Sequence, residues 1–123
     1  MRDFPEGLAP AALNNHWGFI DTAGRWVIPP TYPADIVMDA PLPTVQAFSE
    51  GLAAVKVKGK WGYINTRGEL VIPAIFDDAN ENFEHGLNRV VTHAQKNEYG
   101  WAGAWIDKQG RYVYKEQDFV EPK

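Results

Sequence analysis

The chain contains three copies of one short sequence pattern, and this repeat constrains the fold more than any other feature. The complete pattern is a Phe-x-x-Gly-Leu step, then a Trp-Gly pair with an aromatic residue and isoleucine, then a glycine followed by Val-Ile-Pro. Such a repeat indicates a modular architecture in which each unit buries an apolar face against the next. The matching residues are Phe4, Gly7, Leu8, Trp17, Gly18, Gly24 and Pro29 in the first copy, Phe48, Gly51, Leu52, Trp61, Gly62, Gly68 and Pro73 in the second, and Phe83, Gly86, Leu87, Ile106 and Gly110 in the third.

Apolar and polar residues alternate within the second copy with the period of β-strands. The pattern predicts strands at about 53–58, 61–65 and 70–72, joined by two short turns. Gly68 lies where a turn commonly requires positive φ. Pro73 is expected to end the third strand, because proline cannot donate to a ladder. Each copy therefore predicts a three-stranded antiparallel meander.

The chain is expected to form one all-β domain: three consecutive antiparallel β-meanders in a twisted, elongated or partly closed array. The third copy has Gly103-Ala104 in place of the Trp-Gly pair and Lys115 in place of the proline, as expected of a terminal unit. The only segment whose sequence is compatible with a single helical turn is at about 77–85. The predicted units are repeat one at about 4–35, an exposed irregular loop insert at about 38–46, repeat two at about 48–79, and repeat three at about 83–119 with an insert at about 93–102.

The repeated apolar positions predict the core. Tryptophan offers the largest apolar side chain, and the glycine beside it lets a neighbouring strand approach closely. The two phenylalanines of the later Gly-Leu steps, Phe48 and Phe83, are expected to fill the seams between units. The other predicted core residues are Trp17, Trp61, Ile20, Ile64, Val27, Val71, Ile28 and Ile72.

Composition narrows the function classes. The formal charge of −4 argues against nonspecific nucleic-acid binding, which needs a basic footprint. No apolar run approaches the roughly 20 residues of a membrane span. The first residues do not resemble a signal peptide, so a cytoplasmic location is the expectation. The absence of cysteine excludes disulfides and thiolate chemistry.

No catalytic or metal-binding motif is present in the sequence. The spacing of His16, His85 and His93 fits no metal site, and no cofactor is expected. The single serine, Ser49, lies inside the repeated pattern, so a serine nucleophile is not expected. Phosphate-binding loops and nucleophile elbows are also missing. The inventory therefore predicts a protein that is not an enzyme.

The segment from Gly59 to Pro73 closely resembles the bacterial WG-repeat family, also called KWG repeats. The first copy, from Trp17 to Pro29, resembles it nearly as well, whereas the third copy keeps only its hairpin turn and apolar strand positions. The resemblance implies a β-rich binding or structural module. Some small bacterial domains of this kind are immunity proteins that neutralise a toxin from the same locus. That last step is an analogy at the level of the fold.

Two segments are candidates for binding a partner. The first is the acidic linker after the second copy, which is either a solvated surface or a docking patch for a basic protein. The second is the insert of the third copy, whose aromatic and polar residues are typical of binding loops. Its aromatics alternatively fold back over an open sheet end or stack on sugar rings. The candidate residues are Asp77, Asp78, Glu81 and Glu84 in the linker, and Tyr99 and Trp101 in the insert.

The sequence favours noncatalytic protein–protein recognition, in particular an immunity protein that occludes a toxin domain. A carbohydrate- or envelope-binding module is the first alternative, and it would need exposed aromatic side chains in a shallow groove. A structural piece of a longer repeat array is the second. The sequence does not identify the partner or the oligomeric state.

Overall fold

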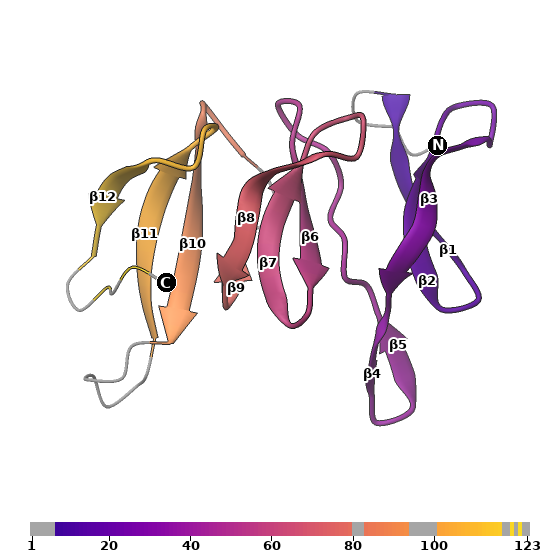
Figure 1. Ribbon diagram of the computed structural model, residues 1–123, viewed down its shortest axis with the longest axis horizontal. Helices are drawn as coiled ribbons and strands as arrows, with labels where there is room; N and C mark the ends of the chain where they lie inside the picture. The colour runs from indigo at the N-terminus through magenta and orange to yellow at the C-terminus, as the bar shows by residue number, and fades with distance from the viewer. Residues whose placement is uncertain (1–6, 80–82, 94–100, 117–118, 120, 122–123) are drawn as a thin grey trace.

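The computed structural model describes residues 7–79, 83–93, 101–116, 119 and 121. These described residues form twelve β-strands and no α-helix, which confirms the predicted all-β class. Nine of the strands make three antiparallel meanders arranged in an open, elongated row (Figure 1). The meanders are β1 (Ala9–Leu13), β2 (His16–Ile20) and β3 (Trp26–Pro33); β6 (Ala53–Val57), β7 (Lys60–Ile64) and β8 (Leu70–Phe76); and β10 (Leu87–His93), β11 (Trp101–Asp107) and β12 (Tyr112–Lys115).

Tight turns set the register of each meander. Lys58 and Gly59 both have positive φ, as the two-residue turn between β6 and β7 requires. Asn14 and Asn15 make the equivalent turn between β1 and β2. The predicted positive φ of Gly68 is confirmed at 84°. The same edge of the row carries the turns between the second and third strands of all three meanders (Figure 1).

The core consists of two apolar layers, one on each side of the central meander. Alternation along β6 and β7 sends side chains to both faces, so the central sheet is buried on both sides. One layer lies between the first and second meanders and contains Phe19, Ile28, Val55 and Ile64. The other lies between the second and third meanders and contains Tyr63, Ile72, Val90, Ala104 and Ile106.

Phe48 and Phe83 fill the seams between meanders, as predicted. Both are fully buried. The Phe48 ring lies edge-on to Phe19 with centroids 4.8 Å apart, and the Phe83 ring lies edge-on to Tyr63 at 5.0 Å. Phe48 and Phe83 therefore each pack on the aromatic residue that follows the preceding Trp-Gly pair. Such pairs add to the burial energy of the rings themselves.

Part of the predicted core is wrong: Val27 and Val71 are both nearly half exposed. Ile64 pairs with Leu70 and Tyr63 with Ile72, so Val71 is an extra residue in a β-bulge and turns outward. Ile28, Ile64 and Ile72 are buried as predicted. Trp17 and Trp61 are partly buried against the two core layers, and Ile20 is of intermediate exposure.

The prediction that Pro73 ends the third strand is also wrong, because β8 continues to Phe76. Tyr63 pairs with Ile72 and Trp61 with Phe76, so three residues of β8 face Gly62 alone. Pro73 is one of these three, and its missing N–H breaks no regular ladder bond. A Cβ at Gly62 would lie 2.6 Å from the carbonyl oxygen of Ile72, so only glycine leaves room for this second bulge.

The first meander repeats this geometry. Phe19 pairs with Ile28 and Trp17 with Tyr32, so the chain bulges opposite Gly18. A Cβ at Gly18 would lie 2.4 Å from the carbonyl oxygen of Ile28. The glycine of the Trp-Gly pair is thus required by the backbone of the bulge that faces it.

The two linkers also differ from the sequence expectation. The insert at 38–46 is not an irregular loop, because it contains part of a hairpin made of β4 (Asp35–Val37) and β5 (Ala40–Leu42). The segment at 77–85 contains no helical turn in its described part. It forms β9 (Asp78–Ala79), which pairs with β10. A hydrogen bond from the Asp77 N–H to the Val91 carbonyl begins this pairing and holds the linker extended.

Candidate functional site

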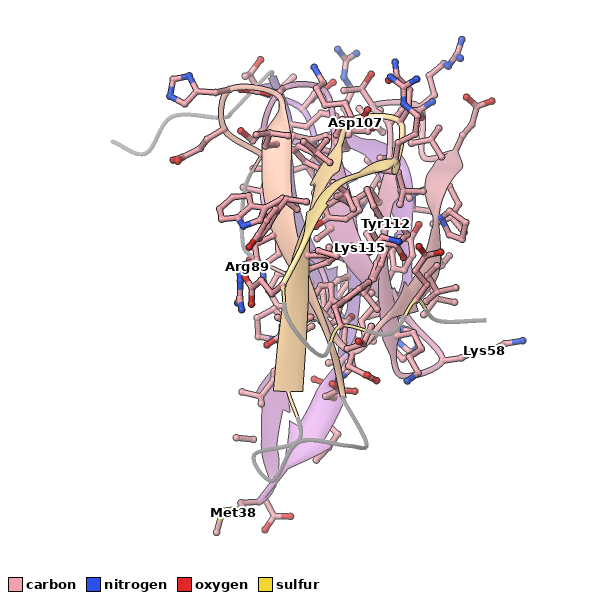
Figure 2. All side chains as sticks on the ribbon, turned by 90° about the vertical axis from the view of Figure 1, so that its left-hand side faces the viewer. Met38, Lys58, Arg89, Asp107, Tyr112 and Lys115 are labelled. Carbon is pink, nitrogen blue, oxygen red and sulfur yellow. The ribbon has the colours of Figure 1, made fainter. Side chains whose placement is uncertain are left out.

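The β4–β5 hairpin projects from the body of the molecule beside the first meander (Figure 1). Two residues, Met38 and Asp39, form its turn with φ values of 51° and 66°, the left-handed pair of a type I′ turn. Figure 2 shows Met38 at the far tip of the hairpin, away from the three sheets. We call residues 35–42 the apolar finger.

Large apolar side chains of the finger face solvent. Ile36 is 57% exposed, Leu42 is 45% exposed and Met38 is 95% exposed. A single exposed apolar residue is ordinary, but several on one projecting element are typical of an interaction site. Methionine suits such a site because its flexible, polarizable side chain adapts to different surfaces.

The base of the finger is fixed to the body by specific contacts. Lys56 of β6 pairs with Asp35 at 2.6 Å between Nζ and Oδ2. The buried Thr44 hydroxyl donates to the Pro33 carbonyl at 2.9 Å. Val45 is buried and bridges to Val55, which adds this segment to the edge of the second sheet. The finger therefore leaves the body from an ordered base.

The strand pairing also limits how the finger can associate. Val37 pairs with Ala40 across the turn, and Ile36 pairs with Pro41. In a hairpin closed by a two-residue turn, this second pair turns its backbone groups outward. Pro41 has no N–H to offer, so the outer edge of β5 is a poor template for another strand. The side chains, rather than the backbone, are what the finger presents.

The structure spreads the acidic linker along the third sheet. Asp77 forms an ion pair with Lys60, and the exposed Asp78 lies in β9 opposite Val91. The exposed Glu84 bridges to Leu87, which lies four positions from Val91 along β10. At the usual strand rise this separates Glu84 from Asp78 by about 13 Å. Glu81 lies outside the described residues. The described carboxylates are therefore not gathered into one patch.

The candidate aromatics of the third insert fall at the margin of the described structure. Trp101 is the first residue of β11, where its backbone pairs with His93. Tyr99 lies outside the described residues. The register places Trp101 at the same end of the third sheet as the start of the insert.

The outer face of the third meander carries an ion pair where the other meanders carry tryptophan. Arg89 makes two hydrogen bonds to Glu116, each 2.7 Å long. These bonds hold the pKa of Glu116 below its ordinary value of 4.5 and raise that of Arg89. The guanidinium lies directly over Gly103, because a Cβ there would come within 2.6 Å of the Arg89 Cζ. Glycine in place of tryptophan makes room for this pair.

In the part of the chain that the structure describes, no three His, Asp or Glu side chains gather as a metal-binding group. The same residues include no helix with the length and apolar character needed to cross a membrane.

Comparison with known proteins identifies the family. The sequence pattern of WG-containing repeats matches residues 17–34, 43–61 and 61–92, which together make up more than half of the chain. The protein therefore belongs to the family of WG-containing repeat proteins. No curated protein and no solved structure matches the chain.

The apolar finger is the feature that the sequence prediction missed. Its turn residues, Met38 and Asp39, are not the Asn-Gly or Asp-Gly that signals a type I′ hairpin. Pro41 and Pro43 further suggested irregular structure. The usable signal was two short apolar segments, residues 36–37 and 40–42, on either side of a two-residue gap.

Proposed function

We propose that this WG-repeat protein is a noncatalytic recognition module that inserts its apolar finger into a cleft of a partner protein. The single observation that carries the proposal is the exposure of Ile36, Met38 and Leu42 on one anchored, projecting hairpin. Burying them against a partner removes apolar area from water, which drives association. An element that is already ordered also loses less conformational entropy on binding.

Inhibition of a toxin is the form of recognition that we favour. A projecting hairpin suits occlusion of an active-site cleft, because it can enter where a flat sheet cannot. Asp39 places a carboxylate beside Met38 at the tip, and the chain carries a formal charge of −4. Both features suit a partner with a basic cleft, such as an enzyme that acts on nucleic acid.

Affinity capture from the source cells tests the proposal. The tagged wild type is compared with a variant carrying Ile36→Ser, Met38→Ser and Leu42→Ser. The matched control carries Val27→Thr and Val71→Thr, which alter exposed apolar residues elsewhere. We expect one stoichiometric protein to be retained by the wild type and the control and lost with the finger variant.

Further measurements separate the possible outcomes. Inhibition of the captured protein's activity by the wild type, and not by the finger variant, would support the toxin-inhibitor form. Equal capture of that protein by all three samples would overturn the role of the finger. Retention of cell-envelope polysaccharide in place of a protein would overturn the recognition of a protein partner.

A further inference from the structure

The outer edge of β12 differs from the edges of β3 and β8, its counterparts in the first two meanders. Prolines interrupt both counterparts: Pro29, Pro30 and Pro33 in β3, and Pro73 in β8. A bulge also distorts each of these strands beside the Trp-Gly pair. Both devices protect a sheet edge from pairing with another strand. β12 has no proline, and Lys115 stands where the second meander has Pro73.

The hydrogen bonds show which backbone groups β12 turns outward. The Glu116 N–H donates to the Gly103 carbonyl at 2.9 Å, which makes these two a hydrogen-bonded pair. The neighbouring pair, Ala104 with Lys115, is therefore a non-hydrogen-bonded pair, so the N–H and C=O of Lys115 point away from β11. Among the described strands, β12 is the last in its sheet. Lys115 thus presents a donor and an acceptor to an added strand.

The side chains of β12 are apolar at the centre and basic at both ends. Val113 is 58% exposed and Tyr114 is 60% exposed. Arg111 precedes the strand with a largely exposed guanidinium that pairs with Asp107 at 2.9 Å, and Lys115 ends the strand. The Lys115 ammonium already contacts the carboxylate of Glu121, so this position accommodates an acidic group. Figure 2 views the molecule from this end and shows Lys115 beside Tyr112.

We infer that the outer edge of β12 binds an extended segment of a partner protein by strand addition. The segment is β-branched or aromatic at its centre and acidic at both ends. Backbone hydrogen bonds from such a segment supply affinity, and contacts with alternate side chains supply specificity. Its carboxylates lie near Arg111 and Lys115, and one of them displaces Glu121.

A second copy of β12 does not fit this edge. Antiparallel pairing centred on Val113 would place Arg111 of one copy opposite Lys115 of the other. Like charges that face each other across a strand pair are destabilising. The edge therefore favours an acidic partner over self-association. This site is separate from the apolar finger, so either proposal can fail while the other stands.

Titration with a synthetic peptide tests the inference by amide NMR. The probe is a capped seven-residue peptide of alternating threonine and valine that begins with aspartate and ends with glutamate. We expect saturable shifts at the amide of Lys115, whose N–H points away from β11. The same peptide with lysine at both ends is the charge control. A peptide N-methylated at its central residues, which cannot complete the ladder, is the backbone control. Neither control is expected to bind.

Two variants separate the backbone from the charge. Lys115→Pro restores the proline of the other repeats and removes the outward N–H, so it should weaken binding about tenfold. Lys115→Gln keeps the amide and removes the charge, so it should weaken binding only about threefold. No binding to the wild type, or equal binding of the N-methylated peptide, would overturn the inference. Because that second comparison uses the unaltered protein, it holds even if Lys115→Pro fails to fold.

Discussion

In the first two meanders the third strand bulges around a glycine, whereas in the third meander it runs in regular register past an alanine. Trp61 pairs with Phe76 across a bulge opposite Gly62, while Ala104 pairs directly with Lys115. The third meander keeps only the irregularity nearer the turn, between Trp105 and Ile106. The two positions, Gly62 and Ala104, differ by a single methyl group, and only the strand that faces the glycine bulges.

The comparison explains why the two residues of the Trp-Gly pair occur together. The tryptophan packs against a core layer, and the glycine admits the bulge that brings a proline to the strand edge. Where the pair is lost, Gly103 makes room for the Arg89–Glu116 ion pair. The lost bulge and proline leave an open edge. The degraded repeat is therefore chemically different from the other two.

The largest expected contrast is between Ile72 and Tyr114, which occupy equivalent positions in the second and third meanders. Ile72 is buried between two meanders, whereas Tyr114 lies on the outer face. Ile72→Ala should cost about 4 kcal/mol, because it leaves a cavity in the core. Tyr114→Ala should cost less than about 1 kcal/mol. Urea unfolding measures both, and equal costs would contradict the difference in burial between these two positions.

The next contrast concerns a carboxylate that joins the second and third meanders. Glu50 accepts hydrogen bonds from the N–H groups of His85 and Gly86, both at 2.8 Å. Glu50→Asn should cost about 2 kcal/mol, because the shorter side chain loses two charge-assisted bonds. Both Glu50 and His85 have positive φ, which asparagine tolerates.

His85 is the matched control, because it occupies the same position in the Phe-x-x-Gly-Leu step of the third copy as Glu50 does in that of the second copy. His85→Asn should change the free energy of unfolding by less than about 0.5 kcal/mol. Losses of similar size in the two variants would show that the contact between meanders does not depend on the Glu50 carboxylate. Urea denaturation of each variant against the wild type gives the comparison.

The smallest effect is expected at the Arg89–Glu116 pair, which stands in the place of tryptophan in the third meander. Glu116→Gln should cost about 1 kcal/mol at neutral pH, because a partly exposed ion pair stabilises weakly. Arg89 holds the pKa of Glu116 below 4.5, its ordinary value. The pair's stabilisation is therefore complete above that pH and is lost as the pH falls through the lowered pKa.

Unfolding of wild type and Glu116→Gln between pH 7 and pH 3 checks this contribution. The difference between the two should shrink as the solution becomes more acidic. A difference that stays constant over the whole range would mean that ionised Glu116 does not stabilise this face.

The repeat predicted the strand order and the turns because these depend on local residues. Gly68 marks the turn between β7 and β8, and the alternation along β6 indicates which face each side chain takes. The orientation of Val71 was not predictable in this way, since a bulge reverses the alternation and its cause, the close approach to Gly62, is a contact between strands. The apolar finger was not predicted because its turn residues, Met38 and Asp39, have no strong preference for a type I′ turn.

The most direct test of the role of the Trp-Gly glycine is the unfolding free energy of Gly62→Ala. We expect a loss of about 3 kcal/mol, because the new methyl group meets the backbone of Ile72 and Ala74. Ala104→Gly in the third meander is the control and should cost only about 1 kcal/mol, through lost burial and added flexibility. Losses below about 0.5 kcal/mol in Gly62→Ala, with Trp61 still paired to Phe76, would show that the bulge does not require glycine at position 62.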